Sequence, residues 1–272
     1  MPTPEEQELY NGRLEKYQGE IDRLVSREET ILLLAKQDDV TAAYKYLVLA
    51  EDMLCLATMH LAKHKLSLAI IKSKNEVSLN DARKALYKSI IYLENIVTDF
   101  IDAPFSDYKD KVAGIANISM KERYYLIRKL GLAIDMVIDA YGDNTKWRWS
   151  FVELQGRFAT IAKNIVDLKD ATENGLNPYS PDYETTVFHL RLTKKLLQKS
   201  ADQHREKYEL ATGGGTSEDF KRAIMYLNAL RRLHLILNEH GDAEEVKRKI
   251  SIWQEKLDKD AKKREDKRKR SV

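Results

Sequence analysis

The sequence contains little of what breaks or cross-links a polypeptide chain. Its 272 residues include 1 cysteine, 5 prolines and 11 glycines. Collagen-like and low-complexity chains need far more glycine or proline, disulfide-stapled domains need more cysteine, and an all-β sandwich needs more turn residues. These shortages leave a helix-dominated protein as the predicted fold class.

Long apolar runs are also absent. The longest useful one, residues 53–62, is about half of the roughly 20 residues that a membrane-spanning helix needs. The N-terminus shows neither the basic nor the apolar region of a secretory signal. We therefore expect no transmembrane segment and take the cytoplasm as the default compartment, with an exported mature chain without disulfides as the open alternative. The lone Cys55 lies in an apolar stretch, where we expect a small buried side chain.

Charge is abundant but nearly balanced over most of the chain. Charged residues make up 33% of the sequence, and the net charge is +3. Residues 256–272 carry nine basic and four acidic side chains, which leaves 37 basic and 39 acidic side chains in the rest of the chain. Any attraction to polyanions is therefore expected from the C-terminal tail rather than from the body.

Apolar residues recur every three or four positions over long segments, which is typical of helices packed along one face. Residues 4–36 carry such a stripe, broken only by Glu28, and residues 147–168 carry an unbroken one. Several segments are about twice the typical helix length of 11 to 12 residues. We predict an all-α fold, an elongated bundle or stacked helical hairpins of about eight or nine long antiparallel helices.

Polar and glycine residues predict where the helices begin and end. The pairs Ser78–Asp81 and Ser119–Glu122 have the spacing of a capping box, Gly142 and Gly241 are expected to end helices, and the glycines at 213–215 are expected to form a flexible joint.

The turn-rich loop 173–180 is the predicted subdomain boundary. It separates an N-terminal helical bundle, residues 1–172, from C-terminal helical hairpins, residues 181–257, that are continuous with the bundle. Residues 258–272 form the basic charged tail.

The segment 146–151 is the most distinctive local cluster. Trp147 lies on the apolar seam, whereas Trp149 is rotated about 200° from it and shares a face with Val152. We predict that Trp149, with Arg148 and Val152, contacts a protein partner, because tryptophan and arginine anchor many interfaces. The alternatives are packing of Trp149 on a second helix of the same chain, which is the commoner arrangement, and insertion into a membrane surface.

The basic residues of the tail are the second candidate site. They are Lys262, Lys263, Arg264, Lys267, Arg268, Lys269 and Arg270. Such a cluster attracts nucleic acid, an anionic surface or an acidic partner, or acts as a nuclear address. The plainer alternative is a solvated extension of the last helix, since cations are favourable at a helix C-terminus.

Motifs for catalysis or for a cofactor are not found. His60 and His64 stand at i and i+4, a spacing that fits one metal ion, but nothing nearby completes the ligand set. The glycines at 213–215 lack the Lys-Ser/Thr of a phosphate-binding loop and follow a predicted helix. We predict no catalytic residue, no cofactor and no metal.

The leading hypothesis is a non-enzymatic helical scaffold or structural subunit that joins other proteins in a larger assembly. The apolar seams fit association with a second copy equally well, so a homo-oligomer stays open. The alternative is an adaptor that binds nucleic acid or an anionic surface through the tail. A third hypothesis is a helical enzyme or ligand carrier with a site assembled from sequence-distant residues, which a buried polar cavity would favour.

Overall fold

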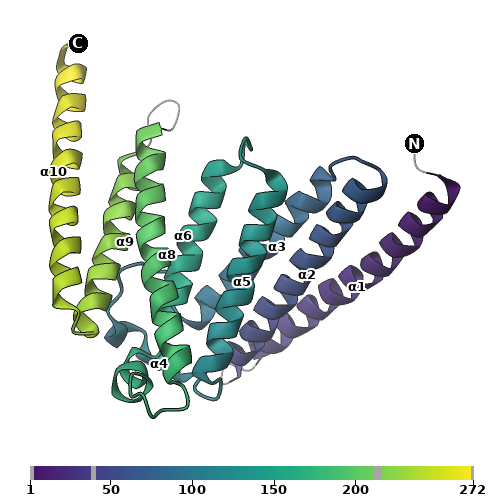
Figure 1. The fold of residues 1–272 in the computed structure, drawn as a ribbon, viewed down its shortest axis with the longest axis horizontal. Coiled ribbons are helices and arrows are strands. Elements are labelled where there is room, and N and C mark those ends of the chain that lie inside the picture. Colours follow the sequence, from purple (N-terminus) through teal and green to yellow (C-terminus); the bar gives the residue numbers. More distant parts are fainter. Residues whose placement is uncertain (1–2, 38–40, 211–215, 271–272) are drawn as a thin grey trace. The chain divides into compact units, whose positions relative to one another are not determined.

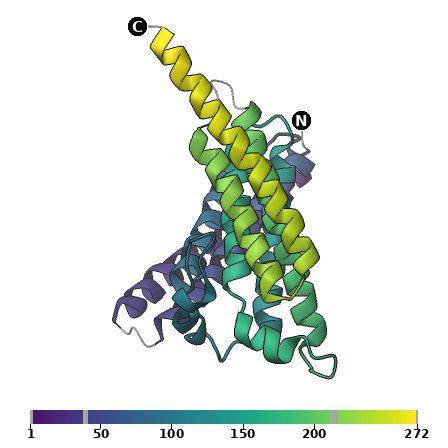
Figure 2. The same cartoon turned by 90° about the vertical axis from the view of Figure 1, so that its left-hand side faces the viewer.

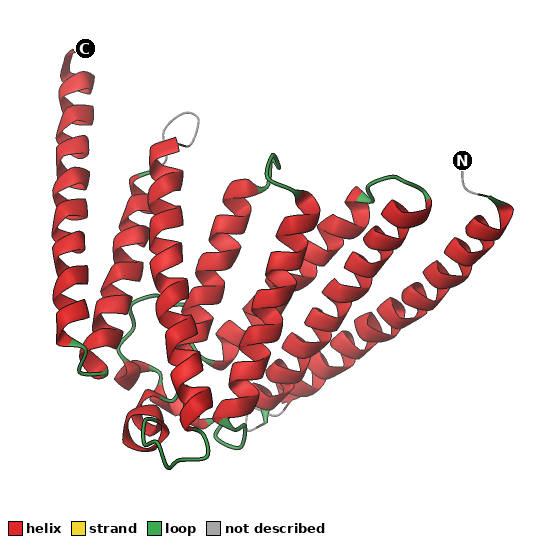
Figure 3. Ribbon diagram, in the orientation of Figure 1, coloured by secondary structure: helices red, strands yellow, loops and turns green. Residues whose placement is uncertain are grey.

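The computed structural model describes residues 3–37, 41–210 and 216–270. The chain is 83% helical, and the described residues contain no strand (Figure 3). The predicted all-α class is therefore confirmed. As also predicted, none of the described helices is both long and apolar enough to cross a bilayer. The predicted joint at 213–215 lies outside the described residues.

Eight helices in the described residues have 17 residues or more, in agreement with the predicted eight or nine. They are α1 (Pro4–Gln37), α2 (Ala42–Ile70), α3 (Glu76–Ile96), α5 (Met120–Tyr141), α6 (Arg148–Asn164), α8 (Tyr183–Leu210), α9 (Ser217–Ile236) and α10 (His240–Arg270). The short elements are η1 (Phe105–Asp107), α4 (Lys109–Ala113), α7 (Leu168–Asp170) and the π-helical turn η2 (Ala171–Gly175).

The chain forms two compact units that interleave along the sequence. Unit 1 comprises Met1–Thr98, Tyr108–Arg148 and Asn164–Asp167, and unit 2 comprises Asp99–Asp107, Trp149–Lys163 and Leu168–Val272. Most of α6 thus belongs with α8, α9 and α10, whereas the sequence-based division kept it in the bundle of residues 1–172. The helix α10 continues to Arg270, so the predicted tail, residues 258–272, begins inside a helix.

The central helix of unit 1 is α2, which packs against α1, α3 and α5 (Figure 1). The residue that breaks the α1 stripe, Glu28, is buried against α3. Lys88 Nζ donates to both Glu28 carboxylate oxygens, at 2.8 and 2.9 Å, and Tyr92 Oη donates to one of them. The stripe therefore continues through Glu28 because α3 supplies two donors for its carboxylate.

The exposure of Cys55 corrects one expectation. This cysteine is exposed rather than buried, although Met53 and Ala57 in the same apolar run are buried at 0% and 1% exposure. Those two residues lie on the opposite side of α2 from Cys55, because successive residues are rotated by about 100° around a helix. An apolar run by itself does not show which side of a helix faces solvent.

The helix ends confirm one capping box and correct the other. Ser119 and Glu122 cap α5 as predicted, and α5 ends before Gly142, which has a φ of +80°. In contrast, α3 begins one turn before the predicted position, because the Asn75 side chain accepts a hydrogen bond from the Ser78 amide at 2.9 Å. Asparagine is as good an N-cap as serine, so the earlier residue takes the cap.

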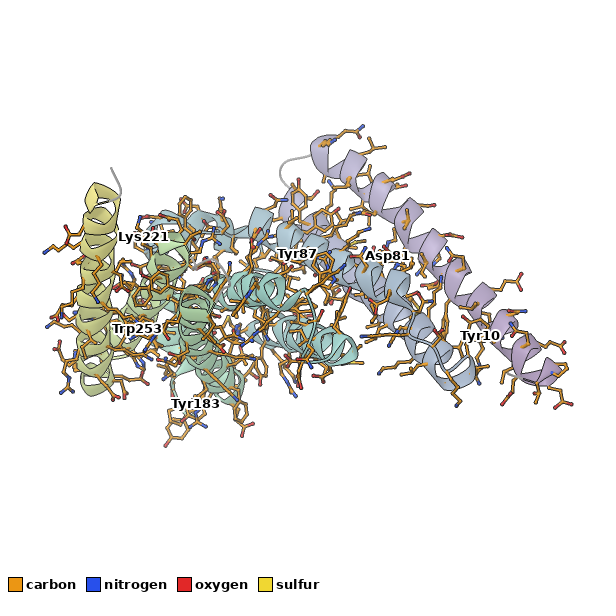
Figure 4. The ribbon with its side chains drawn as sticks, turned by 90° about the horizontal axis from the view of Figure 1, so that it is seen from above. Tyr10, Asp81, Tyr87, Tyr183, Lys221 and Trp253 are labelled. Atoms are coloured by element: carbon orange, nitrogen blue, oxygen red, sulfur yellow. The ribbon has the colours of Figure 1, made fainter. Side chains whose placement is uncertain are left out.

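The central helix of unit 2 is α9, which packs between α8 and α10. Figure 2 shows α10 lying along α9 and continuing beyond its end. Aromatic rings join the three helices: Tyr208 stacks on Phe220 at 4.9 Å between ring centroids, and Phe220 contacts Trp253 at 5.7 Å. Trp253 is labelled in Figure 4 on the side of α10 that faces α9. This aromatic cluster forms the core near the start of α9.

Candidate functional site

The three residues predicted to contact a partner differ in exposure. Arg148 is exposed and Trp149 is half-buried, whereas Val152 is buried. A buried side chain offers no contact area to a partner, so Val152 is removed from the predicted surface. Partner contact through Trp149 and Arg148 stays a prediction.

The same face of α6 continues into the core of unit 2 at Gly156. A methyl group at Gly156 would lie 2.5 Å from Tyr226 Oη and 3.0 Å from His204 Nε2, so α8 and α9 approach α6 closely at this position. Nearly two turns further along α6, His189 Nε2 and Thr193 Oγ1 of α8 both donate to the Ala162 carbonyl, at 3.0 and 3.1 Å. The glycine thus serves packing within the chain.

The candidate polyanion residues all lie on the last part of α10. Lys262 and Lys263 are exposed. The side chains of Arg264, Lys267, Arg268, Lys269 and Arg270 lie outside the described residues. Helical structure extends through these positions to Arg270, so the basic residues continue the helix that carries Trp253 and Leu257 in its buried seam.

The two histidines at i and i+4 on α2 do not form a pair of ligands. His64 is buried, and its Nδ1 accepts a hydrogen bond from the Asn75 amide at 3.2 Å. This contact joins α2 to the start of α3. His60 is half-buried. Burial lowers the pKa of both histidines, which favours their neutral forms.

A polar cavity of about 430 Å³ lies between α8, α9 and α10, within unit 2. It is lined by Lys194 and Gln198 of α8, Leu230 and His234 of α9, and Asp242, Glu245, Val246 and Lys249 of α10. Acidic, basic and imidazole groups therefore meet in one open cavity. The third hypothesis, a helical enzyme or ligand carrier, requires a buried polar cavity, whereas this cavity is open and is lined partly by exposed residues, so it does not meet that condition.

The turn between α9 and α10 places His234 beside Glu239. The Glu239 amide donates to the His234 carbonyl at 2.9 Å, and the Asn238 amide donates to the Leu235 carbonyl at 3.1 Å. Asn238 has a φ of +57°. These are the two hydrogen bonds and the left-handed residue of a Schellman motif. The predicted helix end at Gly241 is therefore wrong, because Asn238 takes the left-handed position and Gly241 lies inside α10.

The side chains of this turn form a cluster with one residue of α8. His234 Nδ1 lies 2.6 Å from Glu239 Oε2 and 3.9 Å from Asp242 Oδ2. Lys194 Nζ lies 2.7 and 2.9 Å from the two Glu239 oxygens. Burial opposes the ionisation of Glu239, but hydrogen bonds from Lys194 and His234 outweigh it and lower the pKa of the carboxyl.

This arrangement is able to hold a cation. His234, Glu239 and Asp242 each offer one ligand atom, and the three atoms lie within 4.8 Å of one another. The cluster has no simple sequence signature, because Glu239 and Asp242 stand five and eight residues after His234 across a helix end, and Lys194 is 40 residues before His234. The one sequence feature that indicates the turn is Asn238, because asparagine tolerates the left-handed conformation that ends a helix and brings the residues before and after it close together.

Fold and cavity together define an all-α protein of packed helical hairpins with a polar site between three of its helices. The chain belongs to the TP0443 family, whose model matches residues 6–261. The matched range includes the start of α6 and the whole α9–α10 turn. No curated protein matches the chain.

Proposed function

We propose that this protein is a non-enzymatic helical scaffold or structural subunit that binds other proteins. The observation that carries the proposal is the partial exposure of Trp149 at the start of α6, beside the exposed Arg148. The same helix is anchored a little further along by the close packing at Gly156. A tryptophan presented by an ordered helix loses little conformational entropy on binding, which makes it an effective interface anchor.

Affinity capture from native extract tests this role. Trp149→Ala is expected to lower the recovery of specific partners by about tenfold, equivalent to about 1.4 kcal/mol of binding free energy. Tyr179→Ala is the matched control, because Tyr179 is also aromatic and is 95% exposed. Circular dichroism should show the same helicity in both variants. If wild type and Trp149→Ala recover the same amount of partner, the role of this surface is contradicted. A separate sedimentation measurement on the pure chain shows whether the partner is a second copy of the same chain.

The adaptor function has its own supporting observation. The buried seam of α10 ends at Leu257, while the helix continues through exposed Lys262 and Lys263 to Arg270. A test must leave Asp260 in place, because Tyr208 Oη donates to its carboxylate at 2.9 Å. Deletion of residues 261–272 is then expected to weaken binding to RNA or anionic vesicles and to reduce its salt dependence. Unchanged affinity across a salt series overturns this function.

A further inference from the structure

We propose that His234, Glu239 and Asp242 form a binding site for a divalent transition-metal ion, with Zn²⁺ as the cation that fits the ligand set. The site lies at the α9–α10 turn, next to the polar cavity of unit 2. The inference is independent of the scaffold function, because it concerns a different part of the chain from Trp149.

The distances between the ligand atoms are close to those around a bound zinc ion. Zinc binds imidazole nitrogen and carboxylate oxygen at about 2.0 to 2.2 Å, so two ligands in a tetrahedron lie about 3.4 Å apart. In the cluster, His234 Nδ1 is 2.6 Å from the nearer Glu239 oxygen and 3.9 Å from the nearer Asp242 oxygen. To reach this value, the first separation must lengthen by about 0.8 Å and the second must shorten by about 0.5 Å, and all three ligand atoms already lie within 4.8 Å of one another.

The backbone fixes two of the ligands before a metal arrives. The Schellman hydrogen bond between the Glu239 amide and the His234 carbonyl, 2.9 Å long, holds these residues side by side. Asp242 follows in the first turn of α10. Three ligands from one short, hydrogen-bonded turn lose little freedom on binding, and the adjoining cavity leaves room for water at the remaining coordination position.

Lys194 is the positively charged partner of Glu239 in this cluster. Its ammonium group contacts both oxygens of Glu239, at 2.7 and 2.9 Å. A divalent ion that binds Glu239 must displace this ammonium group, and Lys194 also lines the adjoining open cavity. The imidazole of His234 then carries its proton on Nε2 and offers Nδ1 to the metal. Lys194 is therefore a competitor that limits the affinity of the site.

Calorimetric titration of EDTA-treated, full-length protein with Zn²⁺ tests the proposal. Wild type should bind one ion per chain, and zinc should raise its melting temperature. Asp242→Asn should weaken binding at least tenfold, and His234→Gln should do the same. Glu244→Gln is the matched control. Glu244 lies close to Asp242 at the start of α10, and its exposed carboxylate pairs with Lys247 instead of His234. Lys194→Met should strengthen binding several-fold.

Co²⁺ provides a second readout that does not depend on stability. Its visible absorption should show tetrahedral coordination in wild type and should be lost in Asp242→Asn, whose exposed position tolerates the change. Absence of stoichiometric binding by both ions, or equal zinc affinity in wild type and Asp242→Asn, overturns the proposal. The cluster then serves only as a hydrogen-bond network between α8 and the α9–α10 turn. Unchanged affinity in Lys194→Met overturns the competitor role of Lys194.

Discussion

His204 is a titratable residue enclosed by the core of unit 2, at 1% exposure. Its ring stacks on Tyr226 at 5.4 Å, and its Nδ1 lies 4.0 Å from Asp219, which is itself paired with Lys207 at 2.7 Å. Burial, assisted by the Lys207 ammonium, lowers the pKa of His204 to about 4, while Asp219 opposes the shift. The folded protein therefore holds this histidine in its neutral form.

The stability of the protein should depend on pH through His204. The unfolded side chain has a pKa of about 6.5, so below that value the unfolded chain binds a proton that the folded chain excludes until about pH 4. The contribution to stability is thus complete above pH 6.5 and falls by about 3 kcal/mol as the pH decreases to 4. In urea unfolding, the difference in unfolding free energy between wild type and His204→Gln should become smaller as the pH decreases. His240 is exposed, so the unfolding free energy of His240→Gln should follow that of wild type at every pH. A constant difference between wild type and His204→Gln contradicts the shift.

Glu28 is a buried charged residue whose contribution to stability depends on its hydrogen-bond partners, Lys88 and Tyr92. Glu28→Ala should cost about 3 kcal/mol, because it leaves the buried Tyr92 hydroxyl without the carboxylate that accepts its hydrogen bond. Lys88 is half exposed and regains water. The double variant Glu28→Leu, Tyr92→Phe should be close to wild type, since it removes the charge and the donor together. A thermal stability of Glu28→Ala equal to that of wild type would show that the pairing itself contributes little.

At the scale of helices, the close approach at Gly156 should be intolerant of any side chain. Gly156→Ala places a methyl group 2.5 Å from Tyr226 Oη, so either the buried Tyr226 side chain or α6 must shift, at a cost of about 1 to 3 kcal/mol. Tyr226→Phe in the same chain should restore part of that loss. Gly19→Ala is the control, because its methyl group meets nothing within 4 Å and replaces a glycine inside α1. It should raise stability by about 0.5 to 1 kcal/mol. Both effects are measured by chemical unfolding. If Gly156→Ala proves more stable than Gly19→Ala, the packing described at Gly156 is refuted.

The helices and helix ends that could be predicted from the sequence are those that depend on residues close together in the chain. The Ser119–Glu122 capping box was predictable because all its partners lie within one turn, and helix identity followed from periodicity over many residues. The start of α3 and the end of α9 were missed because Asn75 and Asn238 competed with Ser78 and Gly241 for the same roles. The cavity was not predictable, because Lys194 meets Glu239 only once α8 has packed against the α9–α10 turn.

At the scale of the whole molecule, both units are built from discontinuous segments. Unit 1 ends with residues 164–167, where the Ile165 carbonyl accepts from Arg123 Nη1 at 3.1 Å, and Asn164 Nδ2 donates to the Thr98 carbonyl at 2.8 Å. Unit 2 takes in the preceding part of α6. The chain therefore passes from one unit to the other within α6 and again directly after it. No single cut near the predicted boundary separates two complete units.

Cutting the chain after residue 172 should consequently fail to give two stable fragments. The fragment 1–172 keeps all the segments of unit 1 but carries α6 without the α8 and α9 groups that meet it at Gly156 and Ala162. It should bind a hydrophobic dye and melt at a lower temperature than the full chain, because α6 then exposes apolar surface to water. The fragment 173–272 should also lose stability, since Tyr226 and His204 lose their glycine neighbour. If both fragments instead unfold cooperatively, as monomers, at the temperature of the full chain, the loop 173–180 is a true domain boundary.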